Sequence, residues 1–412
     1  MKAIKISSGI YSIHADIDDT NDLFEGFWPL PYGVTLNSYI VQGKKTCLID
    51  LFKEWSDSLA QYEEQLISIG VKLEDIDCVV LNHLEPDHTD YLRELRRRNP
   101  TVQIISTEKG VAMLQKFFGI SENLRAVKTG DTLDLGGRTL TFYETPNVHW
   151  PETMMTFDDE SGILFSCDGF GSYGSLGEKV FDDEFSVEEH LKFEKECLRY
   201  YSNIVASFSP FVKKTVEKLD DLKIKVVAPS HGIIWRTEPK KIIERYLRYA
   251  GYNTPVSGQD QGSSLEKEIC IVWSSMYGYT KKGLDAVIEG IKEIGVPFSI
   301  HQLPQTNFSF VLADALKSAG LVIAMPTYEY KMFPPMAHFI DLCGRKHITG
   351  KKVLRIGNWG WVGGAKKEYE TSTAALNWEQ GAQIEWQGIP SEETLKILKE
   401  QGKDLALKIK NS

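Results

Sequence analysis

The chain has 412 residues, 42% hydrophobic and 25% charged, a composition typical of a globular protein with two domains. Its formal net charge of −10 argues against nucleic acid as a partner, because binding to phosphates requires a basic surface. No apolar run approaches the length of a membrane span and the N-terminus lacks a secretory hydrophobic segment, so we expect a cytoplasmic protein without membrane contact.

The first part of the chain mixes strand-like and helical segments. Residues 34–42 and 46–51 predict a pair of strands, and residues 55–69 predict a helix because apolar side chains recur every three or four positions. Residues 77–81 are apolar after Asp77 and form a short run that is typical of a buried strand. A polar motif begins where this run ends, and loops that follow buried strands are held by a rigid scaffold.

Histidines and carboxylates are concentrated in that motif and at three later positions. Four of them fall within six residues, and the other three lie beside strand-like or turn-like sequence. The candidate metal ligands are His83, Glu85, Asp87, His88, His149, Asp168 and His231. A single metal ion needs only three or four ligands, so four imidazoles and three carboxylates suit a two-metal site with one carboxylate left to bridge.

The composition changes at residues 253–266, which are polar, rich in Gly and Ser and without apolar periodicity. We therefore predict a linker there, between a first domain at residues 1–252 and a second at residues 267–412. In the second domain short apolar strands alternate with helical segments, which is typical of a doubly wound parallel sheet. The predicted elements are strands at residues 268–273, 298–302, 320–325, 353–357 and 383–386 and a helix at residues 281–294.

Three loops of the second domain have the composition of a flavin site. In a doubly wound sheet a cofactor binds beyond the carboxyl ends of the strands. The first loop can bind a monophosphate through hydroxyls and N–H groups at a helix N-terminus, and the aromatic residues and glycines of the other two suit a stacked isoalloxazine ring. The candidates are Ser274, Ser275, Met276, Tyr277, Gly278, Tyr279 and Thr280, then Pro326, Thr327, Tyr328, Glu329 and Tyr330, then Asn358, Trp359, Gly360, Trp361 and Gly363. No Gly-x-Gly-x-x-Gly fingerprint follows a strand, so we do not expect a tightly bound dinucleotide.

Two motifs carry a resemblance to known proteins. The run at residues 83–88 is similar to the His-x-His-x-Asp-His metal loop of the metallo-β-lactamase superfamily, except that Glu85 stands in place of the second His. An anionic oxygen in place of a neutral nitrogen moves the preference from zinc towards iron or manganese. The variant His-x-Glu-x-Asp-His distinguishes the flavodiiron proteins, and the Ser-Met-Tyr-Gly-x-Thr stretch of the first flavin loop also resembles theirs. Their third loop usually reads Gly-Trp-Gly-Gly-Gly, and Val362 departs from it.

This resemblance spans nearly the whole chain and implies its fold, cofactors and activity. The implied fold class is α/β, with an N-terminal metallo-β-lactamase-like αββα sandwich and a C-terminal flavodoxin-like doubly wound parallel sheet. The implied cofactors are FMN and two Fe in a non-haem diiron site, which reduces O2 to water, NO to N2O, or both. In such a site His83, Glu85 and His149 would bind one iron, Asp87, His88 and His231 the other, and Asp168 would bridge.

The resemblance also implies partners and pocket residues. An external donor, either rubredoxin or a reduced flavin or deazaflavin carrier, would supply electrons. A head-to-tail homodimer or a dimer of dimers would place the FMN of one chain beside the diiron site of another. Tyr200 or Tyr201 resembles a family segment whose tyrosine reaches the substrate pocket. Glu25 aligns with a pocket position that is His in some members, which leaves the preference between O2 and NO open.

Two other functions are compatible with parts of the sequence. One is a dinuclear zinc hydrolase with a flavodoxin-like regulatory domain, against which Glu85 and the lack of a substrate-recognition insert argue. The other is a pure electron carrier, against which the complete set of seven ligand-type residues argues. The six cysteines contain no Cys-x-x-Cys pair, so we expect no rubredoxin or iron–sulfur module.

Overall fold

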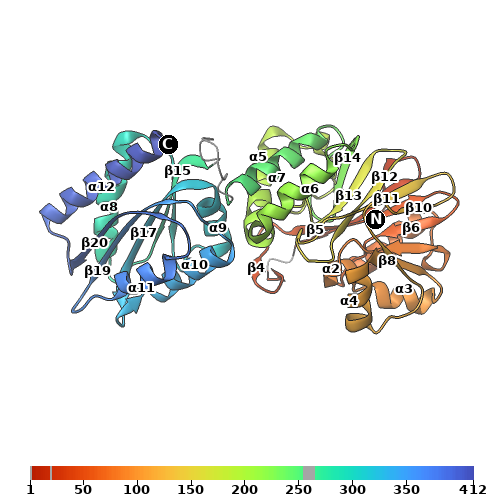
Figure 1. Ribbon diagram of the computed structural model, residues 1–412, viewed down its shortest axis with the longest axis horizontal. Helices are drawn as coiled ribbons and strands as arrows, with labels where there is room; N and C mark the ends of the chain where they lie inside the picture. The colour runs from red at the N-terminus through yellow and green to blue at the C-terminus, as the bar shows by residue number, and fades with distance from the viewer. Residues whose placement is uncertain (1, 19–20, 254–264) are drawn as a thin grey trace. The chain divides into compact units, whose positions relative to one another are not determined.

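Figure 1 shows a computed structural model of the chain, which describes residues 2–18, 21–253 and 265–412. It divides into two compact units, the first made of Met1–Tyr200 and Pro210–Leu247 and the second of Tyr201–Ser209 and Arg248–Ser412. Most of the predicted linker lies outside the described residues. None of the helices in the described part of the chain combines the length and the apolar composition that a bilayer crossing requires.

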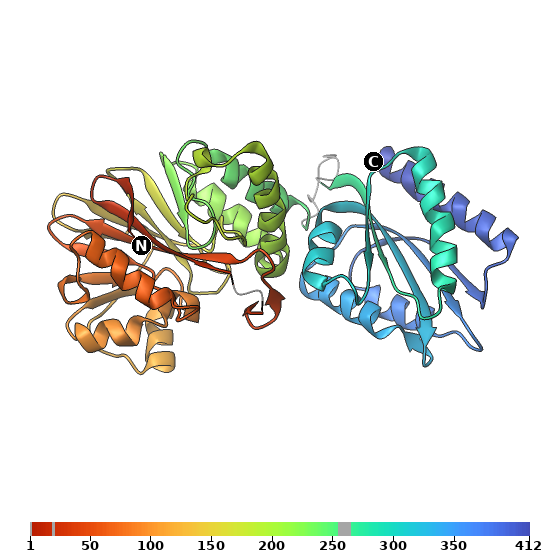
Figure 2. The ribbon, with the colours of Figure 1, turned by 180° about the vertical axis from the view of Figure 1, so that it is seen from behind.

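The first unit consists of two β-sheets with helices on both outer faces (Figures 1 and 2). The seven-stranded sheet contains, in spatial order, β1 (Ile4–Ser7), β2 (Ile10–Ile17), β5 (Val34–Gln42), β6 (Thr46–Ile49), β7 (Cys78–Val80), β8 (Gln103–Thr107) and β9 (Leu124–Val127). The five-stranded sheet contains β10 (Thr132–Asp134), β11 (Thr139–Glu144), β12 (Met154–Asp158), β13 (Ile163–Cys167) and β14 (Val226–Pro229). A small hairpin is formed by β3 (Leu23–Phe24) and β4 (Trp28–Pro29). The helices are α1 (Ser58–Ser68), α2 (Pro86–Thr89), α3 (Leu92–Arg98), α4 (Glu108–Phe118), α5 (Val187–Tyr200), α6 (Ser209–Leu219) and α7 (Pro239–Gly251).

The core of this unit lies between the two sheets. Tyr39 and Val80 of the seven-stranded sheet and Phe142 and Phe165 of the five-stranded sheet belong to one buried apolar cluster. β7 runs parallel to its neighbours β6 and β8, and β13 runs parallel to β14. Parallel neighbours end at the same edge of a sheet, so the loops that follow β13 and β14 lie close together.

The second unit is a doubly wound sheet. Its strands β16 (Phe298–Gln302), β15 (Glu266–Trp273), β17 (Ser318–Tyr328), β19 (Lys352–Trp359) and β20 (Glu379–Gln387) lie in this order and are all parallel, and β18 (Lys331–Met332) pairs antiparallel with β17. The helices are α8 (Tyr279–Ile294), α9 (Phe308–Lys317), α10 (Pro334–Arg345), α11 (Ala365–Thr373) and α12 (Glu392–Lys410). The chain order reverses at β15, between β16 and β17. This is the type of position at which doubly wound sheets bind cofactors.

The predicted fold class is confirmed, while several element boundaries differ from the predicted ones. The strand predicted at residues 320–325 extends to Ser318–Tyr328, because Ser318 pairs with β15, and Thr327 and Tyr328 pair with β18. The strand predicted at residues 383–386 extends to Glu379–Gln387, because its pairing with β19 continues into polar residues that an apolar pattern does not mark. The helix predicted from residue 55 begins at Ser58, since Ser56 and Asp57 have left-handed φ values of 50° and 62°.

Candidate functional site

The seven predicted metal ligands converge in the first unit. His83 and Glu85 come from the loop after β7, Asp87 and His88 from the helical turn α2, and His149 from the loop between β11 and β12. Asp168 and His231 come from the segments directly after β13 and β14. Pro86 opens α2, where its fixed φ suits the first helical position, and this turn carries two of the ligands. Six of the seven are buried, and the side chain of Glu85 is 12% exposed.

The first group of ligands faces one oxygen of Asp168. The Nε2 atom of His83 lies 3.2 Å from Oε2 of Glu85 and 3.4 Å from Oδ2 of Asp168. The Nε2 atom of His149 lies 3.2 Å from the same glutamate oxygen and 3.4 Å from the same aspartate oxygen. Since all four ligand atoms lie within 4.8 Å of one another, a single ion could contact all four side chains.

The second group faces the other oxygen of Asp168. This Oδ1 atom lies 3.1 Å from Nε2 of His88 and 3.2 Å from Nε2 of His231. Oδ2 of Asp87 lies 3.4 Å from Nε2 of His231, and Oδ1 of Asp87 lies 3.7 Å from Nε2 of His88. Asp168 therefore stands between the two groups, in the position that a bridging carboxylate would occupy.

Most of the atoms that face this centre have no hydrogen-bond partner among the described residues. They are both carboxylate oxygens of Asp168, Oδ1 of Asp87, and the Nε2 atoms of His88, His149 and His231. A buried polar atom without a partner costs about 1–3 kcal/mol, and these atoms lie together. The residues present fit a pair of metal ions, and three carboxylates suit iron or manganese better than zinc.

The electrostatics couple the imidazoles to the carboxylates. Burial lowers the pKa of His149, but the Asp168 and Glu85 carboxylates outweigh burial and raise this pKa to about 10. The same balance raises the pKa of His231 to about 9. Burial would raise the pKa of Asp168, yet the surrounding imidazoles hold it well below its usual range. Metal ions would therefore have to displace protons from these imidazoles.

Side chains behind the ligands were not predicted from the sequence. Oε1 of Glu152 lies 2.7 Å from Nδ1 of His83 and also accepts a hydrogen bond from the N–H of Leu84. The carbonyl oxygen of Thr35 lies 2.7 Å from Nδ1 of His231. Such contacts orient a ligand ring and fix its tautomer. Glu152 is only three residues beyond His149, which is the one signal that could have marked it.

The predicted pocket residues have different surroundings. The ring of Tyr200 lies 6.1 Å from that of His231, and its buried hydroxyl has no hydrogen-bond partner among the described residues. The hydroxyl of Tyr201, by contrast, is hydrogen-bonded to Ser209 within the second unit. Glu25 is exposed, and its neighbour Phe24 packs edge-on against His231 at 5.4 Å.

The three candidate flavin segments lie at the carboxyl ends of the adjacent strands β15, β17 and β19. The first follows β15, whereas Pro326–Tyr328 are the last residues of β17, and Asn358 and Trp359 are the last of β19. In the first loop the N–H of Gly278 donates to Oγ of Ser275, and the buried hydroxyl of Thr280 donates to Oδ1 of Asn358 in the third loop. The hydroxyl of Ser274 donates to the carbonyl of Leu303, so it serves the scaffold.

Aromatic side chains of these loops are exposed, and one glycine allows two loops to approach. Tyr277 and Trp361 are 80% and 79% exposed, and Tyr330 is 64% exposed. A Cβ on Gly364 would lie 2.1 Å from the carbonyl oxygen of Tyr330, whereas a Cβ on Gly363 would have its nearest neighbour at 3.6 Å. The close approach of the second and third loops therefore requires Gly364, the last residue of the predicted third loop, which the composition did not distinguish from Gly363.

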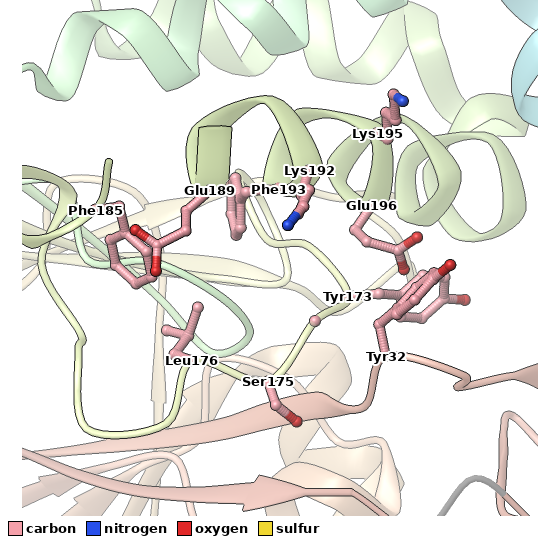
Figure 3. Close-up of a pocket in the computed structure, with 11 residues that line it drawn as sticks. Tyr32, Tyr173, Ser175, Leu176, Phe185, Glu189, Lys192, Phe193, Lys195 and Glu196 are labelled. Carbon is pink, nitrogen blue, oxygen red and sulfur yellow. The ribbon is translucent and has the colours of Figure 1, made fainter. Parts of the chain in front are cut away.

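A separate pocket in the first unit has a volume of about 510 Å³ (Figure 3). Tyr32, Tyr173, Phe185 and Phe193 line it, and none of the predicted ligands does. The ring of Tyr173 packs at 5.1 Å against that of Tyr200. An aromatic layer therefore lies between this pocket and His231.

Comparison with known proteins gives a consistent result. Residues 34–232 match the model described as ODP family beta lactamase. The chain is 32% identical over 380 residues to an anaerobic nitric oxide reductase flavorubredoxin of Pectobacterium atrosepticum, covering 91% of this chain and 71% of that protein. It is similar to the rubredoxin oxygen:oxidoreductase of Desulfovibrio gigas, with 25% identity, a TM-score of 0.89 and coverage of 100% and 99%. A variant of the flavo di-iron protein of Thermotoga maritima has 26% identity, a TM-score of 0.86 and coverage of 99% and 98%.

Proposed function

The chain belongs to the flavodiiron proteins, and on this basis we propose that it is an oxidoreductase that reduces O2 to water, NO to N2O, or both. The observation that supports this most directly is the position of Asp168, with one oxygen 3.4 Å from His83 and the other 3.1 Å from His88. Relatives named for nitric oxide and for oxygen reduction support both substrates. The dinuclear zinc hydrolase is not favoured.

We propose that the seven ligands hold two non-haem irons. His83, Glu85 and His149 would hold one, Asp87, His88 and His231 the other, and Asp168 both. When bound, this iron pair supplies two electrons and open coordination positions for a diatomic gas, and reduced FMN supplies two more. Four electrons are what O2 needs to become two waters, and two are what the coupling of two NO molecules needs.

Aromatic side chains border one side of the proposed metal centre. Phe24 and Tyr200 both pack against His231, which supports a role in excluding water from the substrate position. The Tyr200 hydroxyl is buried and has no hydrogen-bond partner among the described residues, so we assign it to donate a hydrogen bond to bound substrate. We propose no such contact for Tyr201, whose hydroxyl pairs with Ser209.

We further propose that the three loops of the second unit bind FMN. The support is their place after adjacent strands, the helix N-terminus at Tyr279 and the exposed aromatic rings. An external donor such as rubredoxin would reduce this flavin, and a head-to-tail homodimer would bring it to the iron pair of another subunit. The division into residues 1–252, a linker at 253–266 and residues 267–412 belongs to the same proposal.

Cofactor analysis of the purified protein tests this function. We expect about two irons and one FMN per chain, as the ligand count implies. We also expect consumption of O2 or NO with a reduced donor and no release of peroxide. Full zinc occupancy with hydrolytic activity, in protein prepared with iron supplied, would overturn the proposal.

A flavin-depleted preparation tests the route of the electrons. Chemically reduced protein that retains iron but lacks FMN should oxidise its irons once when mixed with O2 and then stall. Addition of FMN should restore turnover. If a protein donor sustains four-electron turnover without FMN, the second unit is not the entry point for electrons.

A further inference from the structure

The ligand histidines differ in what holds the ring nitrogen that faces away from the metal centre. Nδ1 of His83 lies 2.7 Å from a carboxylate oxygen of Glu152, and Nδ1 of His231 lies 2.7 Å from the carbonyl oxygen of Thr35. Both partners are strong acceptors, so each Nδ1 carries the proton. Each Nε2 then presents a lone pair to the metal position.

His88 differs, because the atom in hydrogen-bond contact with its Nδ1 is a thiol sulfur and not an oxygen acceptor. Its Nδ1 lies 3.7 Å from Sγ of Cys167 and 3.9 Å from Oδ2 of Asp50. All three side chains are buried, and their candidate ligand atoms lie within 4.8 Å of one another. The carboxylate of Asp50 is also committed elsewhere, because it accepts a hydrogen bond of 2.8 Å from the N–H of Asn82.

The two neighbours of Nδ1 favour opposite tautomers. The Asp50 carboxylate can only accept, so it favours the ring with its proton on Nδ1 and a free lone pair on Nε2. The Cys167 thiol can donate its S–H to Nδ1, which favours the ring with its proton on Nε2. A neutral imidazole in that second form cannot use Nε2 as a ligand, so the tautomer decides whether His88 can bind a metal ion.

We propose that Cys167 is a positioning residue that competes with Asp50 for Nδ1 of His88 and so controls whether His88 completes the second metal position. This inference rests on the proposed metal centre. It makes His88 the ligand whose bond to the metal is most easily exchanged, because the thiol opposes the ligating tautomer. The backbone conformation supports a fixed role for Cys167, which has a left-handed φ of 54° and directly precedes the ligand Asp168.

Stepwise binding of cobalt(II) to metal-free protein, followed by visible absorption against a competing chelator, tests the proposal. Cys167→Ala removes the competing donor, so the second cobalt should bind about 10-fold more tightly, the lower end of the usual effect of an outer-shell change. Cys167→Ser keeps a hydroxyl donor and should bind it no more tightly than the wild type. A residue that merely filled space would give the opposite order, with alanine worst because of its cavity.

Two further measurements separate the explanations. Asp50→Asn replaces an acceptor-only group by one that can also donate, so it should weaken the second cobalt site by about 10-fold or more. Cys47→Ala removes another buried thiol of the same unit, one that donates to the carbonyl of Leu48. It should leave the affinities for the first and the second cobalt unchanged. In zinc-loaded protein, ¹⁵N-histidine spectra should show more of the Nε2-bound form of His88 in Cys167→Ala than in the wild type.

The possible failures are distinguishable. If the wild-type chain binds no cobalt at these ligands, the metal centre itself is refuted, and this inference falls with it. If the wild type binds two ions but Cys167→Ala binds the second more weakly, the thiol acts as an acceptor that supports His88, and only this inference is overturned. Equal affinities in all three forms at position 167 would overturn it as well.

Discussion

The two candidate sites are built in different ways. The metal centre consists of buried side chains whose facing atoms lack hydrogen-bond partners among the described residues. The flavin loops consist of backbone turns and exposed rings such as those of Tyr277 and Trp361. The first site depends on the chemistry of a few side chains and the second on the path of the backbone. Single changes of side-chain chemistry should therefore be decisive at the first site and changes of loop shape at the second.

Asp168→Asn should have the largest effect. The variant keeps the shape of the side chain but removes the charge that faces both ligand groups, so metal content should fall below about one ion per chain. Asp182→Asn is the matched control, because Asp182 is a buried carboxylate of the same unit that accepts N–H groups of Thr237 and Glu238. It should lower the melting temperature and leave the metal content unchanged. Two spin-coupled irons in Asp168→Asn would show that the site does not depend on this carboxylate.

Gly364→Ala should have the largest effect on the flavin loops. The new methyl group would meet the carbonyl of Tyr330, so the second and third loops must separate and FMN affinity should fall about 10-fold or more. Gly344→Ala in α10 is the control, since it lies outside the three loops and a Cβ there would meet only a side-chain carbon of Leu376 at 3.8 Å. Fluorescence titration with FMN measures both affinities, and iron content should stay constant. Equal FMN affinities would mean that the approach of these loops is not part of the flavin site.

The sequence predicted different parts of the two sites. The metal ligands were recognisable because His, Asp and Glu are seldom clustered without a function, and each follows a strand or turn that the apolar pattern marks. Thr35 and Cys167, which contact the outer ring nitrogens of His231 and His88, lie far along the chain from these two ligands, so residue spacing does not reveal the contacts. At the flavin loops the sequence indicated a glycine-rich segment that ends at Gly364, but only the backbone path assigns the contact with Tyr330 to Gly364 and not to Gly363.

Glu152→Gln should have an intermediate effect on the metal centre. It retains an oxygen that can accept from His83 but loses the negative charge that strengthens this imidazole as a ligand, so metal affinity should fall about 10- to 100-fold. Glu144→Gln removes the same charge from the end of β11, where Glu144 accepts from the N–H of Thr129, and should leave the affinity unchanged. Iron dissociation in the presence of a chelator compares the two. A loss of affinity in both variants would point to overall charge and not to the support of His83.

Buried charge provides a further contrast between the units. In the first unit the buried carboxylates and imidazoles face one another. In the second unit Lys351 is fully buried, and its Nζ donates a 2.6 Å hydrogen bond to the carbonyl of Leu316. Burial lowers the pKa of Lys351 to about 7, and the opposing effects of Cys343, Cys270 and Glu268 offset only part of this shift.

Lys351→Met should therefore change how stability depends on pH. Between pH 7 and the ordinary lysine range, the folded chain has lost the proton of Lys351 while the unfolded chain still holds it. The unfolded state then binds more protons, so the free energy of unfolding of the wild type should rise with pH, by up to about 1.4 kcal/mol per pH unit from this group. The methionine variant should lose this slope, and Lys352→Met, at a side chain that reaches the surface, should keep it. Chemical denaturation at pH 7, 8 and 9, monitored through the second unit, measures the slope, and an unchanged slope in Lys351→Met would show that this lysine remains charged in the folded chain.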